Sequence, residues 1–272
     1  VERSLLFSKT RLEQEVRQVG EKPILRLKEL KVVNEEGHPL IKDCSFEVHE
    51  REILGIAGVA GNGQQELAES LFGIRTIASG QIWIDGTNVV GVETEDLLAM
   101  GVTYIPEDRL QDGFLPAANV AQNLILGYQR QEPYSKGSFL DWKAIYRSAR
   151  ELISEYNIMT PNAREPAANL SGGNIQRVML ARAFSHPAKL LVAHNPTRGL
   201  DIGSMEFVYS RLLALKQQGM ATLLLSDDLD ELILLSDRIA TIYRGQIVGV
   251  LEKSQFDKYE IGRMMSGVVA RE

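Results

Sequence analysis

The octapeptide Leu170-Ser-Gly-Gly-Asn-Ile-Gln-Arg177 decides how the rest of the chain is interpreted. With a composition like this one, the pattern L-S-G-G-x-x-Q-R occurs by chance in fewer than about one chain in 10⁴. Ser171 is placed to cap a helix that runs through Val178 to Phe184. Gly172 and Gly173 let an anion approach the free backbone N–H groups at the positive end of the helix dipole. The octapeptide therefore predicts a phosphate site, and the alternative is an ordinary Ser-capped helix.

A second glycine-rich stretch follows the buried-strand pattern Glu52–Ala57 and has the sequence Gly58-Val-Ala-Gly-Asn-Gly-Gln-Gln65. A helical pattern from Glu66 to Phe72 comes next and ends at Gly73. Strand, glycine loop and helix in this order are typical of a P-loop, although its Lys and its Ser/Thr are absent. The alternative is a tight strand-to-helix turn. The residues that we expect to contact a nucleotide in this loop are Gly58, Gly61, Asn62, Gly63, Gln64 and Gln65.

Short apolar runs between helical segments predict a largely parallel sheet with helices on its faces. The alternating patterns of Ile24–Val33 and Leu40–Val48 predict an antiparallel flank. Helical spacing dominates between Thr94 and Ala168, which predicts a helical subdomain inserted in an α/β core. The runs that we expect to form the parallel strands are Glu52–Ala57, Lys189–Ala193, Ala221–Ser226 and Ile239–Tyr243.

The composition excludes several classes of protein. With 44% hydrophobic and 24% charged residues, the 272-residue chain is neither disordered nor collagen-like. A formal net charge of −6 provides no diffuse basic field for nucleic acid or an anionic membrane, so any phosphate must be held locally. Cys44 is the only cysteine, which excludes an internal disulfide and fits a reducing compartment. No apolar run reaches about 18 residues, the length that a membrane-spanning helix needs. The four histidines lack metal-ligand spacing, so no metal site is expected.

A third motif completes the pattern. The apolar run Leu190–Ala193 leads into His194-Asn-Pro-Thr-Arg-Gly-Leu-Asp201. The order of glycine loop, L-S-G-G-x-x-Q helix and strand closed by P-T-x-G-L-D resembles the ATP-binding cassette (ABC) family of ATPases over about 230 residues. The resemblance implies a RecA-like P-loop NTPase core with an antiparallel β flank and an inserted helical subdomain. Tyr104-Ile-Pro-Glu-Asp-Arg109 and Gly199–Val208 are similar to the second, C-terminal cassette of the fused double-cassette subunits that energise importers of simple sugars and nucleosides, and the latter stretch is closer to the nucleoside group.

The resemblance also implies a domain division. Residues 1–22 are expected to be a linker from a preceding cassette, with an N-terminal amphipathic helix as the alternative. Residues 23–272 are expected to form the nucleotide-binding domain, with the helical subdomain at about 94–168.

Several polar positions depart from the family pattern. In an active cassette the P-loop Lys contacts the β- and γ-phosphates, and the adjacent Ser/Thr holds Mg²⁺. Gln64 and Gln65 occupy these positions here. After the third strand, where the family has a Mg²⁺-binding Asp and a Glu that acts as general base, the chain has His194 and Asn195.

Two further replacements affect the same site, because Asp227 stands where the family has a switch histidine and Glu107 where it has a loop glutamine. Loss of a Lys–phosphate contact costs about 1.5–3 kcal/mol, and loss of a general base lowers the rate about 10²–10⁴-fold. We therefore expect weak or no ATP binding at this P-loop, no intact catalytic residue and no ATPase activity of the chain alone.

The resemblance implies that two cassettes pair head to tail. Each ATP then lies between the P-loop of one cassette and the L-S-G-G-x-x-Q helix, called the signature helix, of the other. The chain therefore implies a partner cassette, in the same polypeptide, whose P-loop is intact and binds Mg-ATP. Asp201 corresponds to the D-loop aspartate between the two. The signature residues that would complete the partner's site are Ser171, Gly172, Gly173, Asn174 and Gln176.

The further partners that the resemblance implies are transmembrane permease subunits, contacted by the helical subdomain, and indirectly an extracytoplasmic solute-binding protein. The chain would then act peripherally at the cytoplasmic face of the plasma (inner) membrane, in ATP-driven uptake of a nucleoside or simple sugar. One alternative is a non-transport ABC ATPase of translation or DNA repair, against which the acidic charge and the P-E-D-R variant argue. Another is a purely structural cassette.

Overall fold

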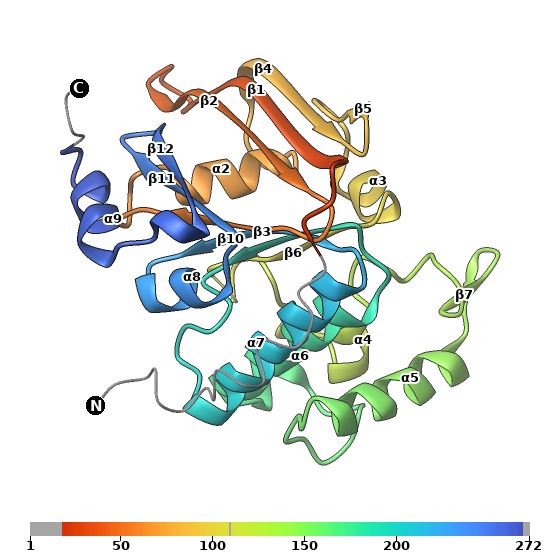
Figure 1. Ribbon diagram of the computed structural model, residues 1–272. Coiled ribbons are helices and arrows are strands. Elements are labelled where there is room, and N and C mark those ends of the chain that lie inside the picture. The colour runs from red at the N-terminus through yellow and green to blue at the C-terminus, as the bar shows by residue number, and fades with distance from the viewer. Residues whose placement is uncertain (1–17, 109, 269–272) are drawn as a thin grey trace.

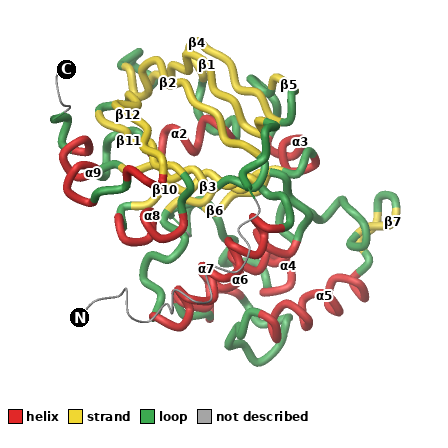
Figure 2. Tube along the Cα trace, viewed as in Figure 1, coloured by secondary structure: helices red, strands yellow, loops and turns green. Residues whose placement is uncertain are grey.

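The computed structural model describes residues 18–108 and 110–268, so most of the linker predicted for residues 1–22 lies outside the described residues. Figure 1 shows an antiparallel sheet above a mostly parallel sheet, with the helices α4, α5, α6 and α7 on the opposite side of the parallel sheet. Figure 2 shows the same division, with most strands in the upper half and these helices in the lower half.

The larger sheet has the strand order β12-β11-β3-β10-β9-β6. Its strands are parallel except for β12, which pairs antiparallel with β11 as a hairpin. All parallel strands therefore present their carboxyl ends along one edge, where open α/β sheets bind ligands. The strands are β3 (Ile53–Ala57), β6 (Val102–Ile105), β9 (Leu190–His194), β10 (Ala221–Ser226), β11 (Arg238–Tyr243) and β12 (Gln246–Glu252).

The smaller sheet is antiparallel, with the order β2-β1-β4-β5, and a separate two-stranded hairpin lies in the helical part. The strands of the smaller sheet are β1 (Pro23–Val33), β2 (Pro39–His49), β4 (Ile77–Ile84) and β5 (Thr87–Asn88), and those of the hairpin are β7 (Ser135–Lys136) and β8 (Phe139–Leu140).

Helices cover both faces of the parallel sheet. The α-helices are α2 (Gln64–Leu71), α3 (Thr94–Ala99), α4 (Val120–Leu124), α5 (Trp142–Glu155), α6 (Gly172–Ser185), α7 (Ile202–Gln217), α8 (Leu229–Leu235) and α9 (Lys258–Met265), and the 3₁₀ turns are η2 (Ala167–Asn169) and η3 (Lys253–Gln255).

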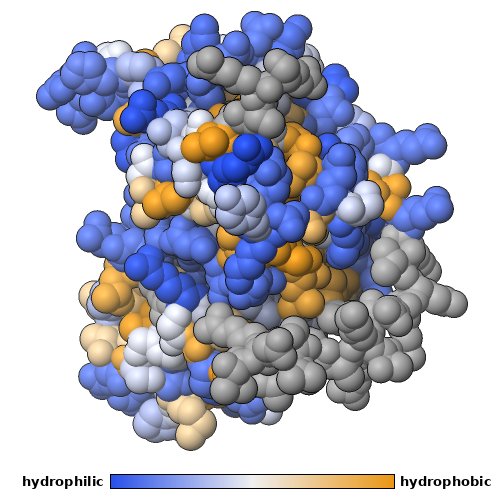
Figure 3. Space-filling view, turned by 60° about the vertical axis from the view of Figure 1, so that its left-hand side comes forward, coloured by the Kyte–Doolittle hydropathy of each residue, from blue (hydrophilic) through white to orange (hydrophobic). Residues whose placement is uncertain are grey.

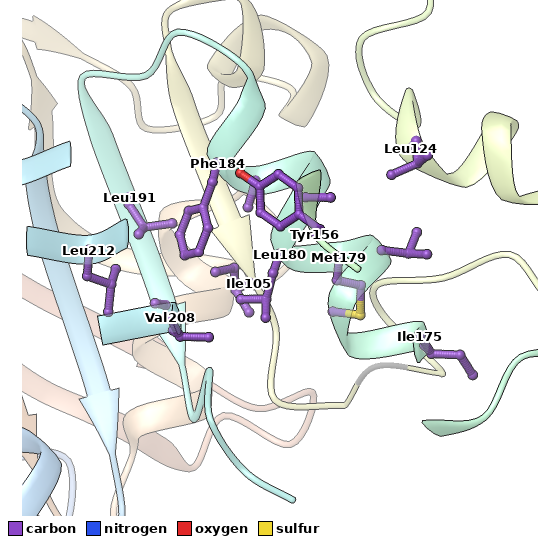
Figure 4. Close-up of a cluster of buried hydrophobic side chains, with 14 of the residues drawn as sticks. Ile105, Leu124, Tyr156, Ile175, Met179, Leu180, Phe184, Leu191, Val208 and Leu212 are labelled. Carbon is purple, nitrogen blue, oxygen red and sulfur yellow. The ribbon is translucent and has the colours of Figure 1, made fainter. Parts of the chain in front are cut away.

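Two hydrophobic cores lie on the two faces of the parallel sheet, because successive side chains of a strand point to opposite faces. In β9, Leu191 and Ala193 join the core that contains α6 and α7, whereas Leu190 and Val192 join the core under the antiparallel sheet. Figure 4 shows the first core, with Phe184 of α6 beside Leu191. The face of the molecule in Figure 3 is mostly hydrophilic, with smaller hydrophobic areas between the polar side chains.

The predicted fold class is confirmed, with its parallel core, antiparallel flank and helical insertion. Five of the described strands were not expected from the sequence: β4 and β5 extend the antiparallel sheet, and β6, β7 and β8 lie inside the range 94–168, where β6 pairs with β9 in the parallel sheet. The four residues of β6 give too short an apolar run to be distinguished from a helical segment. The helices α4 and α5 follow it.

The β11–β12 turn fixes the glycine loop against the antiparallel sheet. Gly245 has φ 76°, its N–H donates to the Asn62 carbonyl at 2.8 Å, and its carbonyl accepts from the Lys42 N–H at 2.7 Å. A Cβ atom at Gly245 would lie 2.0 Å from the carbonyl oxygen of Leu40. Glycine is therefore required at this position both by its backbone conformation and by the close approach of β2.

We predict that Gly245→Ala lowers the free energy of unfolding by at least about 3 kcal/mol, because a left-handed backbone and a backbone clash add together. Gly37→Ala is the matched control, since Gly37 has φ 82° and nothing lies within 4 Å of its added Cβ. The control should lose about 1–2 kcal/mol. Urea unfolding of both variants measures the difference, and equal losses would show that the contact with Leu40 is unimportant.

Candidate functional site

Four of the predicted polar residues meet at the carboxyl edge of the parallel sheet. His194 ends β9 and Asn195 follows it, Asp227 follows β10, and Glu107 lies two residues after β6. Because β6, β9 and β10 are neighbours in the sheet, their ends bring together residues that are far apart in the sequence.

The Asn195 side chain connects the ends of these three strands. Its Nδ2 donates to Glu107 Oε1 at 3.0 Å and to Asp227 Oδ2 at 3.2 Å, and its Oδ1 accepts from the Asp227 N–H at 2.9 Å. The residue has φ 46°, a left-handed conformation that asparagine tolerates better than most residues. Its amide is therefore fully engaged by protein groups.

Two basic side chains, Arg198 and His194, also lie beside Glu107. Arg198 Nη1 donates to Glu107 Oε1 at 2.5 Å, and His194 Nε2 lies 3.6 Å from Glu107 Oε2. Burial lowers the pKa of His194, which is 2% exposed, against the opposing effect of the Glu107 and Asp227 charges. The imidazole is therefore mainly neutral at physiological pH, and the Arg198 guanidinium supplies the positive charge beside Glu107.

The glycine loop between β3 and α2 has the backbone of a phosphate cradle but not its side chains. Gly61 and Gly63 have φ 83° and 111°. Gln64 is 3% exposed, and its Nε2 donates to the carbonyl of Ile56 at 3.1 Å. Gln65 Nε2 donates to Glu69 Oε1 at 2.7 Å. Both glutamines thus form hydrogen bonds within the chain, at the positions where the sequence resemblance leads us to expect phosphate and Mg²⁺ ligands.

An acidic cavity of about 830 Å³ lies beside this loop. Burial raises the pKa of Asp112 there, and the neighbouring Asp108 and Glu69 charges raise it further. Among the lining residues that the structure describes, Arg198 is the one cationic side chain. The polar residues that line the cavity are Gln65, Glu69, Tyr104, Glu107, Asp108, Gln111, Asp112, His194 and Arg198.

These residues do not fit the terminal phosphates of Mg-ATP. Among the described lining residues a polyanion would meet four carboxylates, of which Glu69 is paired with Arg75 and Glu107 with Arg198. Like charges at short range repel strongly when partly buried. No cluster of three or more His, Cys, Asp or Glu residues in ranges 18–108 and 110–268 is placed to hold a metal ion. The nucleotide contacts expected for Gly58, Gly61 and Asn62 stay predictions.

The N-terminus of α6 is different, because its first turn is open. Ser171 occupies the N-cap position but makes no capping hydrogen bond through its side chain to the described backbone. Its hydroxyl instead accepts from Asn174 Nδ2 at 2.9 Å, which corrects the capping role expected from the sequence. Nothing lies within 4 Å of a Cβ atom added at Gly172 or at Gly173. The backbone donors of this turn therefore fit an approaching anion.

Side chains of α6 connect this turn to the segment after β9. Gln176 is 1% exposed, and its Nε2 donates to the Pro196 carbonyl at 2.5 Å, one residue after Asn195. Arg177 Nη2 donates to Ser204 Oγ at 2.9 Å and lies 3.9 Å from Asp201 Oδ2. Asp201 is itself the N-cap of α7. Gln176 and Asp201, both expected from the sequence to be site residues, are thus connected through α6 and the segment between β9 and α7.

A buried hydrogen bond between this segment and a glutamate of α8 was not expected from the sequence. Thr197 Oγ1 donates to Glu231 Oε1 at 2.6 Å, and Glu231 is 2% exposed. Burial raises the pKa of Glu231, and the nearby Asp228 charge adds to this effect. The sequence offered one indication of this contact, a glutamate among the apolar residues of α8. Glu231 belongs to none of the motifs considered above.

Comparisons with known proteins bear on the family and the fold of the chain. Residues 41–198 match the family model described as "ABC transporter". The chain is 36% identical over 244 residues to the nucleoside import ATP-binding protein NupA of Lactococcus lactis, covering 90% of this chain and 48% of that protein. It is 36% identical over 249 residues to the guanosine import ATP-binding protein NupO of Bacillus subtilis, covering 92% and 49%. The chain thus spans about half the length of these relatives.

The fold is also found in solved structures. A crystal structure of a nucleotide-free ATP-binding cassette from an ABC transporter superposes with a TM-score of 0.70 and 20% sequence identity, covering 90% of this chain and 95% of that one. At this identity the likeness shows the fold alone. Within the described ranges, no helix is both long enough and apolar enough to span a bilayer.

Glu231 gives a pH-dependent prediction. Its pKa in the folded chain lies above the ordinary value of 4.5, so the ionised form opposes folding and stability falls as the pH rises through the folded pKa. Glu231→Gln cannot ionise and keeps an oxygen for the Thr197 hydroxyl. The stability of this variant relative to wild type should therefore increase from about pH 5 to about pH 8 in urea unfolding. A difference that is constant or that decreases would contradict the assignment.

Proposed function

The chain belongs to the ABC transporter family, and we propose that it is the non-hydrolysing cassette of an ATP-driven importer. In this proposal it pairs head to tail with a cassette whose P-loop is intact. Its own loop at 58–65 does not turn over ATP, while Ser171, Gly172 and Gly173 complete the partner's site. The observation that carries the proposal is the contrast between the carboxyl edge of the parallel sheet and the N-terminus of α6. The polar groups at the sheet edge are bonded to one another, whereas the first turn of α6 is open.

The chemistry of the α6 end supports a role toward the partner's nucleotide. When Mg-ATP is bound by the partner, the metal ion there neutralises charge on the phosphates. The residues of this chain add backbone N–H donors at a helix N-terminus, which stabilise negative charge that shifts during phosphoryl transfer. Asn174 orients the turn, since its Oδ1 accepts from the Met159 N–H at 2.8 Å and its Nδ2 donates to Ser171.

The same proposal assigns solute class and partners. Relatives named for the import of nucleosides, guanosine and arabinose support a nucleoside or simple sugar as the solute. The partner cassette would precede this one in a single polypeptide. Residues 23–272 would form the nucleotide-binding domain, and the helical segments of range 94–168 would contact transmembrane permease subunits. The chain would then lie peripherally at the cytoplasmic face of the plasma membrane and serve an extracytoplasmic solute-binding protein only indirectly.

We predict that Gly172→Asp lowers ATPase activity and solute uptake of the assembled transporter at least about a hundredfold, because a carboxylate would face the partner's phosphates. The added side chain meets no atom of the chain within 4 Å of its Cβ, so the fold is expected to be retained. Both activities are measured in proteoliposomes.

Gln65→Ala is the matched control at the chain's own loop, where the exposed side chain contacts Glu69. It should change either activity less than about twofold, a difference in barrier below about 0.5 kcal/mol. Equal losses from the two substitutions, or a larger loss from Gln65→Ala, would show that the chain's own loop is catalytic and that the proposed division is wrong.

A further inference from the structure

The exposed face of α5 carries a row of cations. Lys143, Arg147 and Arg150 are spaced by four and three residues, so they lie on one side of the helix, opposite the buried Ala144, Ile145, Ala149 and Leu152. All three are exposed, and none forms an ion pair with any carboxylate in the described part of the chain. We call these three residues the basic ridge.

The acidic groups nearby leave the basic ridge positive. Asp141, at the N-cap of α5, is paired with Lys136 at 2.8 Å. Glu155 is paired with Arg211. Glu151 is exposed and lies four residues after Arg147, on the same side of the helix, but it forms no ion pair with Arg147. The outward face therefore presents three positive charges and one negative charge.

An aromatic surface borders the basic ridge. The rings of Trp142 and Tyr146 stack with centroids 5.7 Å apart, and Trp142 is 41% exposed. On the adjoining strand β8, Phe139 is 81% exposed and Leu140 is 40% exposed. Figure 1 shows the β7 hairpin and α5 at the outer edge of the molecule, away from the antiparallel sheet. Large apolar side chains and cations thus share one projecting surface.

We propose that the basic ridge, together with Phe139, Leu140 and Trp142, binds the surface of a bilayer that contains anionic phospholipids. Protein segments that lie at such surfaces combine Lys and Arg with apolar side chains that enter the headgroup boundary. The apolar face of α5 itself is buried, so Phe139, Leu140 and Trp142 are the side chains available for this contact. The net charge of −6 does not prevent this contact, because charges farther than about 8 Å are largely screened at physiological ionic strength. The local charge of the ridge determines the attraction.

A lipid surface fits these residues better than a membrane protein's cytoplasmic loop does. Such loops carry an excess of Lys and Arg, which would repel the basic ridge, whereas phosphate headgroups attract it. Phe139 and Trp142 also suit the boundary between headgroups and acyl chains, where aromatic rings are enriched. This inference concerns only the outward face of α5 and the adjoining β8, outside the ATP sites. It leaves the other helical segments of range 94–168 for the permease contact of the proposed function.

The test is co-sedimentation of the purified chain with phosphatidylcholine vesicles that contain either no phosphatidylglycerol or about 30%. Each basic residue near an anionic surface increases partitioning about fivefold. The chain should bind the anionic vesicles, bind the neutral ones at least about tenfold more weakly, and dissociate as salt is raised. Lys143→Glu/Arg147→Glu should reduce binding to the anionic vesicles at least about twenty-fivefold.

Lys28→Glu/Lys31→Glu is the control, because it makes the same charge change at exposed positions of β1. It should reduce binding less than about twofold. Wild-type emission should also shift to the blue on addition of anionic vesicles, and Trp142→Phe should remove the shift. No binding of wild type to anionic vesicles, equal binding to both kinds, or equal losses from the two double variants would overturn the proposal. Equal losses would mean that net charge alone governs the interaction.

Discussion

The Asn195 amide is the contact on which the rest of the site depends. It joins the ends of β6, β9 and β10 through Glu107 and Asp227, at the edge where a sheet of this kind binds its ligand. Asn195 can do so because its backbone is left-handed and its side chain both donates and accepts. A carboxylate at the same position could only accept, and it would repel the two acids that the amide now connects.

The contact has consequences on both sides of the sheet edge. Toward the glycine loop, the strand-end groups and both glutamines are bonded within the chain, and four carboxylates lie among the described residues that line the adjoining cavity. Toward α6, the backbone one residue farther on accepts from Gln176, which connects the segment to the signature helix. In the proposed division, the groups that would act on a nucleotide in this chain are used for internal structure, while the first turn of α6 keeps open space around its glycines.

The sequence predicted the parts that depend on local periodicity. The strands β1 and β2 begin and end within about two residues of their alternating patterns, because alternation follows directly from the pleat, and β10 spans the same residues as its expected apolar run. β6 was not separated from the helical region because its four residues carry too little pattern. The Asn195 network was beyond sequence reasoning for another reason: Glu107 lies 88 residues before Asn195, and only the packing of β6 against β9 brings the two together. The hydroxyl of Ser171 was assigned to the wrong partner because the competing Asn174 amide lies one helical turn away.

In the proposed division, the edge formed by Glu107, Asn195 and Asp227 does not hold Mg-ATP. Isothermal titration of the purified chain with ATP, with and without Mg²⁺, measures this. We predict a dissociation constant weaker than about 1 mM that Mg²⁺ does not improve, because Gln64 and Gln65 are bonded within the chain and the carboxylates of the cavity repel the phosphates. A dissociation constant near about 10 μM that depends on Mg²⁺ would show that this edge does bind the nucleotide, since it would require metal and phosphate ligands that these side chains do not provide.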